Sequence, residues 1–215
     1  MLPAVATGFV VDDVVLWRGY GGQHHPDGDV ARWHAPDGSS VLLYHLAPDG
    51  YELGASLPTN LRHARERWDA LHAVLAPRAT VGEVLLPNGA DHHARQAQRA
   101  EAVRALAAVA TRAQVRLTSL GAFGRALTNA AYDADLPDVA GELRDSYGYT
   151  WTLQGTFATR SSLKRRAARA ERALLRDVEP WVALADRRSR ANRSALARSA
   201  WKTLLQCQPH DTLCG

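Results

Sequence analysis

The feature that most constrains the fold is an alternation of short apolar runs with helix-like segments, which extends to about residue 130. Residues 9–17 are rich in valine and run into Arg-Gly-Tyr-Gly-Gly, and residues 39–45 form a second apolar run after a Pro-Asp-Gly turn. Residues 60–75 place leucines and Trp68 at helical spacing. This alternation predicts an α/β layer with a mainly parallel sheet.

The same pattern continues after residue 80. Residues 81–86 and 115–118 are short apolar runs that predict two more strands. Residues 91–111 are rich in alanine and predict a helix. Ser119 is suited to cap a further helix that reaches residue 127.

The character of the chain changes after Leu136-Pro137. Residues 161–205 are dominated by Ala, Leu and Arg and predict two long helices, with a break at Glu179-Pro180 and a looser stretch near residues 187–192. Two such helices are half of a bundle and need partners to bury their apolar faces. We therefore expect a partial α/β domain over residues 1–135 and a partial helical domain over residues 136–215.

Composition and charge exclude several classes of protein. The net charge of +4 comes mostly from arginines in an alanine-rich background with acids between them, which is typical of solvated helix faces and not of a one-sided nucleic-acid surface. We expect no nucleic-acid partner. No stretch has the length of a transmembrane helix, and the N-terminus has no signal-peptide pattern, so we expect no membrane association and a cytoplasmic location.

Three loops carry groups that could do chemistry: Trp-Arg-Gly (17–19), Asn-Gly-Ala-Asp-His-His (88–93) and Gln-Pro-His-Asp (208–211). The first two follow predicted strands, where ligands bind in α/β proteins. Asp91 could cap a helix or could present a carboxylate for proton transfer or for sugar hydroxyls. Arg18 could form a structural ion pair or orient a carboxylate. His210 and Asp211 could serve a metal and a substrate, or lie in an unstructured tail.

Taken in order, several stretches resemble glycoside hydrolase family 38, the α-mannosidases, and especially its bacterial branch. The matching motifs are Val-Leu-Trp-Arg-Gly (15–19), Trp-His-Ala-Pro-Asp-Gly-Ser (33–39), Leu-Pro-Asn-Gly-Ala-Asp-His (86–92), Gly-Glu-Leu-Arg (141–144), Gly-Thr-Phe-Ala-Thr-Arg (155–160) and Gln-Pro-His-Asp (208–211). The resemblance implies the C-terminal part of the family's α/β catalytic domain, followed by an incomplete three-helix-bundle middle domain.

The resemblance also implies a chemistry. Family members are retaining enzymes that use a carboxylate nucleophile, a second carboxylate as acid and base, and a zinc ion that holds two sugar hydroxyls. Asp91 matches the acid/base, Arg18 an arginine near the nucleophile, and His210 a zinc ligand. Asp211 matches a carboxylate that binds sugar hydroxyls, and Tyr51 is expected to line the sugar site. The implied partner is an α-mannoside or oligosaccharide, with a homo-oligomer possible for the intact parent.

The resemblance gives no counterpart here for the family's nucleophile or for its N-terminal His-x-Asp pair of zinc ligands. We therefore expect the chain to be an internal fragment that is inactive in isolation. The alternatives are a related enzyme with another sugar preference and a non-catalytic carbohydrate-binding or interaction remnant of the same scaffold.

Overall fold

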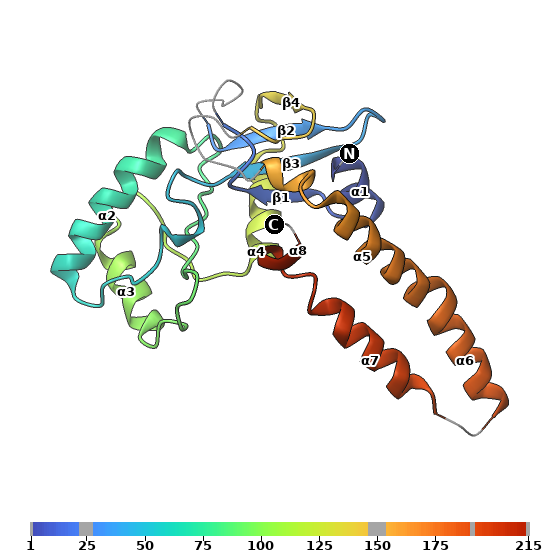
Figure 1. The fold of residues 1–215 in the computed structure, drawn as a ribbon. Coiled ribbons are helices and arrows are strands. Elements are labelled where there is room, and N and C mark those ends of the chain that lie inside the picture. Colours follow the sequence, from blue (N-terminus) through green and yellow to red (C-terminus); the bar gives the residue numbers. More distant parts are fainter. Residues whose placement is uncertain (1, 22–27, 146–153, 190–191, 214–215) are drawn as a thin grey trace. The chain divides into compact units, whose positions relative to one another are not determined.

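The computed structural model describes residues 2–21, 28–145, 154–189 and 192–213, and it divides into two compact units, Met1–Thr152 and Leu153–Gly215 (Figure 1). The elements of the first unit are α1 (Leu2–Gly8), β1 (Asp13–Leu16), β2 (Val30–His34), β3 (Ser40–His45), η2 (Gly50–Glu52), α2 (Leu61–Leu75), η3 (Ala76–Arg78), α3 (Arg99–Val109), α4 (Leu120–Ala130) and β4 (Asp138–Ala140). Those of the second are η4 (Gln154–Phe157), α5 (Ser161–Ala173), η5 (Leu174–Val178), α6 (Glu179–Arg188), α7 (Ser194–Leu205) and α8 (His210–Leu213).

The boundary expected between residues 135 and 136 lies inside the first unit. β4 follows that point and pairs with β2, and the indole Nε1 of Trp33 donates a hydrogen bond to the carbonyl oxygen of Gly141 at 2.9 Å. These contacts hold residues 138–141 to the sheet of the first unit.

The sheet has the strand order β1-β3-β2-β4. β1 pairs with β3 and β2 with β4 in parallel, whereas β2 and β3 are antiparallel. The Pro-Asp-Gly turn explains the antiparallel pair, because a connection of a few residues can join only a hairpin. In that turn Gly38 has a φ of +87° and Asp37 accepts a hydrogen bond from the amide of Ser39 at 3.0 Å. The expected mainly parallel sheet is thus a mixed one.

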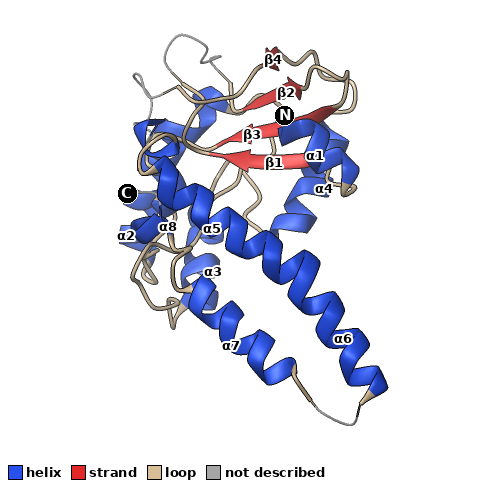
Figure 2. Ribbon diagram, turned by 45° about the vertical axis from the view of Figure 1, so that its right-hand side comes forward, coloured by secondary structure: helices blue, strands red, loops and turns tan. Residues whose placement is uncertain are grey.

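Helices cover both faces of this sheet (Figure 2). In β3, Val41 and Leu43 face a cluster that includes Ala6 of α1, while Leu42 and Tyr44 face a cluster that includes Phe123 of α4. Side chains alternate along a strand, so a run that is apolar at every position is buried on both faces. A third cluster lies between α2 and α3, around Leu71 and Leu106. The α/β class predicted from the sequence is confirmed.

Several local predictions are wrong. Residues 81–86 and 115–118 are not strands among the described residues, and β1 starts only at Asp13 because Phe9 and Val11 donate to the carbonyl of Ala6 and so end α1. The apolar side chains of the two missing strands pack against the sheet and helix clusters instead. The amide of Leu85, for example, donates to the hydroxyl of Tyr44 at 2.9 Å and not to a strand neighbour.

The second unit consists of two helical arms. α5, η5 and α6 form one continuous arm, so the expected break at Glu179-Pro180 is absent. η5 is a π-helical turn that directly precedes α6, in which Pro180 lies in the first turn. Proline lacks an amide proton and crowds the carbonyl four residues earlier, and a π turn at this point accommodates both effects.

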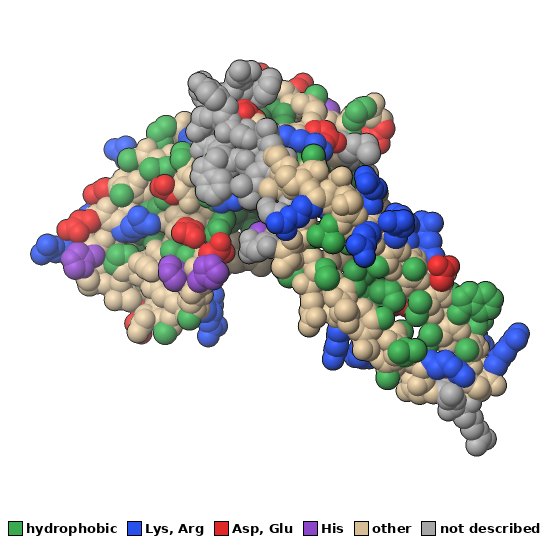
Figure 3. Space-filling view, in the orientation of Figure 1, with side chains coloured by type: hydrophobic (Ala, Val, Ile, Leu, Met, Phe, Trp, Pro, Cys, Tyr) green, Lys and Arg blue, Asp and Glu red, His purple; other side chains and the backbone are tan. Residues whose placement is uncertain are grey.

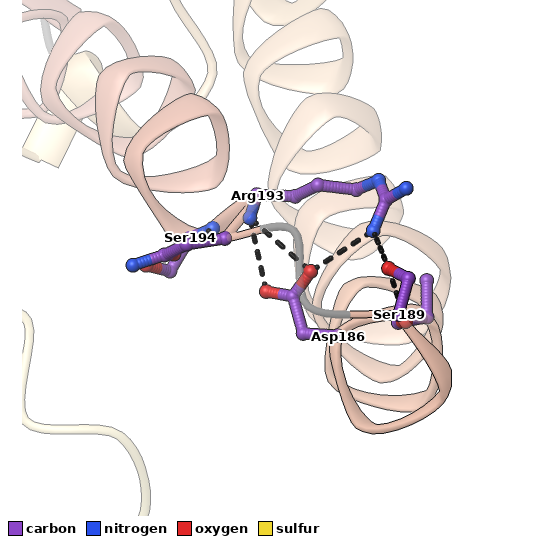
Figure 4. Close-up of polar contacts among 6 residues, drawn as sticks. Asp186, Ser189, Arg193 and Ser194 are labelled. Carbon is purple, nitrogen blue, oxygen red and sulfur yellow. Dashed lines mark hydrogen bonds and ion pairs between the residues drawn. The ribbon is translucent and has the colours of Figure 1, made fainter.

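α7 forms the second arm, and a polar cluster ties its start to the end of α6 (Figure 4). The carboxylate of Asp186 accepts hydrogen bonds from the amide and from the guanidinium of Arg193, at 3.0 and 3.1 Å. The same guanidinium donates to the hydroxyl of Ser189 at 2.9 Å. Within the described part of the chain, none of the helices is both long and apolar enough to cross a membrane.

Candidate functional site

The candidate site lies at the edge of the sheet where β1 and β3 end. Trp17 and Arg18 follow β1, and Tyr51 lies in η2, a few residues after β3. Parallel strands end at the same edge, which is where α/β folds bind ligands. Three residues singled out from the sequence, Arg18, Tyr51 and Asp91, come together at this edge.

A buried polar network fixes the backbone behind the site. The imidazole Nε2 of His45 lies 3.0 Å from the carbonyl oxygen of Trp17, and the guanidinium of Arg78 donates to the carbonyl oxygen of His45 at 3.1 Å. Asp29, which is almost fully buried, accepts a hydrogen bond from the amide of Thr80 at 2.9 Å. Burial raises the pKa of the Asp29 carboxyl, against the opposing effect of its hydrogen bonds with Thr80.

The indole of Trp17 forms the platform of the site. Its Nε1 donates to the carbonyl oxygen of Pro48 at 3.1 Å, which lays the ring over the turn that starts η2. Gly50 in that turn has a φ of +61°, and a Cβ atom there would lie 2.5 Å from Cε2 of Trp17. Only glycine meets both conditions, because it tolerates a positive φ and leaves room for the ring.

The side chains of Arg18 and Tyr51 pack on this platform. The guanidinium carbon of Arg18 lies 4.5 Å from the centroid of the Trp17 ring, within the range of a cation–π contact. Tyr51 meets the same indole in an edge-to-face arrangement, with ring centroids 5.4 Å apart and planes at 88°. Trp17 therefore joins a cation and a phenol that are 33 positions apart in the chain.

Asp91 reaches the cluster from a third segment. The hydroxyl of Tyr51 donates to Oδ2 of Asp91 at 2.8 Å, and the amide of Asp91 donates to Oε1 of Glu52 at 3.3 Å. The hydrogen bond to Asp91 is the main reason that the pKa of Tyr51 is raised, and the charges of Asp91 and Glu52 add to it while Arg18 opposes it. Asp91 is not the helix cap considered from the sequence, because α3 begins only at Arg99.

Two amide side chains hold the segment that carries Asp91 in place. Gln96 donates to the carbonyl oxygen of Leu57 at 2.7 Å and accepts from the amide of Leu57 at 3.1 Å, so that it pairs with this residue as a strand neighbour would. Asn88 donates to the carbonyl oxygen of Gly54 at 2.8 Å and to Oε1 of Gln96 at 3.2 Å. These bonds explain why residues 91–98 do not join the predicted helix.

Asp91 presents its carboxylate at a solvent-accessible position. Its side chain is exposed, and one oxygen, Oδ2, is engaged by Tyr51. Among the described residues, no donor contacts the other oxygen, Oδ1, which is therefore available to a ligand. A carboxylate, a guanidinium and two aromatic rings make a surface suited to a polar ligand with an apolar face, such as a sugar.

The other two residues predicted from the sequence, His210 and Asp211, belong to the second unit. His210 starts the short helix α8 and is exposed. Asp211 lies in the same helix, but its side chain lies outside the described part of the structure. Over residues 2–21, 28–145, 154–189 and 192–213, no three His, Cys, Asp or Glu side chains gather in a way that could hold a metal ion. The described residues do not make a zinc site by themselves.

Sequence reasoning missed Trp17, Glu52 and Gln96 as parts of the site. Trp17 had a signal, because an aromatic residue directly after a strand and before Arg-Gly is a natural platform. Glu52 and Gln96 act through hydrogen bonds to distant backbone groups, Glu52 to the amide of residue 91 and Gln96 to the amide and carbonyl of residue 57. Such long-range pairings leave no periodic pattern in the sequence.

Comparison with known proteins gives one curated relative and two solved structures that concern glycoside hydrolases. No family model matches the chain. A curated protein of Halalkalibacterium halodurans, named "Putative mannosylglycerate hydrolase", is 28% identical over 186 residues, which are 85% of this chain and 20% of that protein.

Two solved structures share the fold. An α-mannosidase from Enterococcus faecalis superposes with a TM-score of 0.72 and 25% identity, over 94% of this chain and 23% of that one. A protein in glycosyl hydrolase family 38 from the same organism superposes with a TM-score of 0.62 and 20% identity, over 100% of this chain and 22% of that one. The chain thus spans about a fifth of the length of the relatives that it matches. The resemblance seen in the sequence is confirmed, because the chain is similar in fold to part of an α-mannosidase and to part of a protein in glycosyl hydrolase family 38.

Proposed function

We propose that this chain supplies the acid/base side of a site that cleaves terminal α-mannosides. The observation that carries the proposal is the convergence of Asp91, Tyr51 and Arg18 around Trp17 at the carboxyl edge of β1 and β3. These residues come from three separate segments of the chain. The names of the relatives support the substrate class, because each concerns a mannosidase, its family or a mannosylated compound.

In the proposed reaction Asp91 acts twice. It first donates a proton to the oxygen that leaves the sugar, and it then takes a proton from the water that releases the product. In a retaining enzyme a second carboxylate, about 5–5.5 Å away, forms the covalent bond to the sugar. The family resemblance gives that nucleophile no counterpart in this sequence, so we expect these 215 residues alone to show no turnover.

Arg18 and Trp17 would orient the sugar. A guanidinium presents several hydrogen-bond donors in a fixed plane, which suits hydroxyls and carboxylates. The relative named for mannosylglycerate suggests that the leaving group could carry a carboxylate, and Arg18 is the cation nearest to the platform in the described cluster. We therefore include a mannoside with an acidic aglycone among the ligands to be tested.

Zinc belongs to the proposal only through His210 and Asp211. In the family's pattern these two residues would hold the ion and a sugar hydroxyl, and the ion would stabilise the distorted sugar ring. A zinc site needs three or four protein ligands, and His210 is the one such ligand proposed here. No step of the proposed reaction is therefore assigned to the metal.

The proposal is tested by sugar binding, because binding does not need the nucleophile. The purified chain is titrated with methyl α-mannoside, mannosylglycerate and methyl α-glucoside, and the indole signal of Trp17 is followed by NMR. We expect the two mannosides to shift this signal and Asp91→Asn to weaken the effect at least several-fold. Asp69→Asn, an exposed acid on α2, is the matched control. Failure of every sugar to shift Trp17 would contradict the proposed site, and turnover of an aryl α-mannoside would contradict the expected inactivity.

A further inference from the structure

We propose that Tyr51 and Glu52 together form a clamp that positions Asp91, with Tyr51 holding its side chain and Glu52 its backbone. The inference rests on the proposed function of Asp91 and assigns to Tyr51 a positioning role, where the sequence suggested a sugar contact. The clamp itself is a matter of geometry that can be measured without any sugar.

The first hold is on the carboxylate. The hydroxyl of Tyr51 donates to Oδ2 of Asp91 at 2.8 Å, the usual length of a hydrogen bond between two oxygens. Because a phenol has one proton to donate, this bond selects one oxygen and fixes the direction of the other. Oδ1 is then the oxygen left to face a substrate.

The second hold is on the main chain of the same residue. Oε1 of Glu52 accepts the amide proton of Asp91 at 3.3 Å. Consecutive residues on η2 thus contact one residue at two points, its side chain and its amide. A single contact would leave Asp91 free to rotate about its backbone, whereas two contacts fix both the chain and the carboxylate.

The clamp has a rigid base. Tyr51 packs edge to face on Trp17, whose indole donates to Pro48 and whose carbonyl oxygen contacts His45. Asn88 and Gln96 hold the segment on either side of Asp91, and the clamp adds contacts at Asp91 itself. The next residue, His92, has a φ of +60°, an uncommon conformation that surrounding contacts must maintain.

The clamp also sets how Tyr51 ionises. The pKa of Tyr51 is raised chiefly by its hydrogen bond to Asp91, then by burial and by the charges of Asp91 and Glu52, while Arg18 lowers it. If the clamp exists, removing the charge of Asp91 lowers the pKa of Tyr51.

The test labels the tyrosine ring carbons of the full chain and follows the ionisation of Tyr51 by NMR between pH 8 and pH 12. The Tyr51 signal is assigned by its loss in Tyr51→Phe. We expect the wild-type phenol to ionise above the ordinary value of 10.0. We expect Asp91→Asn to lower that pKa and Asp69→Asn to leave it unchanged.

Two further variants separate the two holds. Tyr51→Phe should shift the Asp91 carboxyl carbon signal and leave its amide protected from exchange. Glu52→Ala should speed exchange of the Asp91 amide while Tyr51 still ionises above its ordinary value. Circular dichroism identifies any variant that has lost its fold. An ordinary Tyr51 pKa in the wild type, or one that Asp91→Asn does not change, would overturn the clamp. A confirmed clamp with no sugar binding would instead contradict only the proposed function.

Discussion

At the scale of single residues, the site depends on groups that never face a ligand. Asp29 is an example, because it is almost fully buried and yet carries a carboxyl group. It accepts from the amide of Thr80, and its own amide contacts the hydroxyl of Thr80 at 3.2 Å, so the two residues bridge the start of β2 and the segment after η3. Its role is structural, and its ionisation costs stability because burial disfavours the charge.

This cost predicts a pH dependence. Burial is the main reason that the pKa of Asp29 in the folded protein lies above the ordinary value of 3.8. A raised pKa means that the protonated carboxyl favours folding, so its contribution is full below pH 3.8 and is lost as pH rises through the folded value. Asp29→Asn keeps an acceptor for Thr80 and has no charge. In urea titrations we expect the free energy of unfolding of Asp29→Asn, minus that of the wild type, to increase from pH 3.8 to pH 7.

The matched variant Asp29→Ala removes the acceptor as well as the charge. It leaves the amide of Thr80 without its buried partner, so we expect a loss of about 1–3 kcal/mol near neutral pH. A difference between Asp29→Asn and wild type that is the same at pH 4 and pH 7 would show that burial does not raise the pKa of Asp29.

Gly50 gives a second prediction at this scale. Gly50→Ala places a Cβ atom 2.5 Å from the Trp17 ring at a φ of +61°, so the ring must move away from its position over η2. Gly38→Ala is the control, because Gly38 has a φ of +87° but no atom within 4 Å of the added Cβ. Both variants should lose about 1–2 kcal/mol to the left-handed backbone. Only Gly50→Ala should shift the Trp17 indole signal, and an equal shift in both would contradict the steric argument.

At the scale of helices and strands, what the sequence could predict depended on whether local patterns or distant contacts decide the structure. α2, α4 and β3 were predicted closely, because helical spacing, a capping residue and a run of apolar residues are local signals. Residues 91–98 have helical composition, but they do not form a helix. Asn88 binds the backbone of residue 54, and Gln96 binds the backbone of residue 57. Such contacts override propensity and cannot be read from a neighbouring stretch.

The start of α4 provides the prediction at this scale. The hydroxyl of Ser119 accepts from the amide of Ala122 at 3.3 Å and so satisfies one of the unpaired amides of the first turn. Ser119→Ala should lower the free energy of unfolding by about 0.5–2 kcal/mol, while Ser119→Asp should retain most of it. Urea unfolding measures both. Equal stability of Ser119→Ala and wild type would mean that packing of Phe123 and Leu127 alone holds the helix.

At the scale of the whole molecule, the order of motifs along the chain predicted the similarity to α-mannosidases although several local predictions failed. The Trp-Arg-Gly and Gly-Ala-Asp-His motifs lie in loops, where binding and catalytic residues of proteins concentrate, and not in the elements between them. These motifs singled out Arg18 and Asp91, whereas the contacts that bring them together with Tyr51 around Trp17 depend on the fold. The position of the first unit's boundary was not predicted, because it depends on the pairing of β4 with β2.

The two units differ in how much apolar surface they bury, and this difference predicts their dynamics. In the described part of the second unit the buried apolar residues are Leu174, Ala197 and Leu204, and Trp181 and Leu196 are 69% and 74% exposed. Apolar side chains accordingly gather on the visible face of α5–α7 (Figure 3). Helices with few buried contacts open at low free energy, whereas core strands open only with global unfolding.

Hydrogen exchange of the full chain measures this difference. We expect backbone amides in α5, α6 and α7 to exchange at least tenfold faster than those of β2 and β3, because each factor of ten corresponds to about 1.4 kcal/mol of opening free energy. The hydrogen bonds between Asp186 and Arg193 should slow amide hydrogen exchange only near the start of α7. Arg193→Ala should remove that local effect and leave β2 and β3 unchanged. Equal protection in both units would mean that the exposed apolar face is covered in solution, and a dependence of that protection on protein concentration would identify a second copy as the cover.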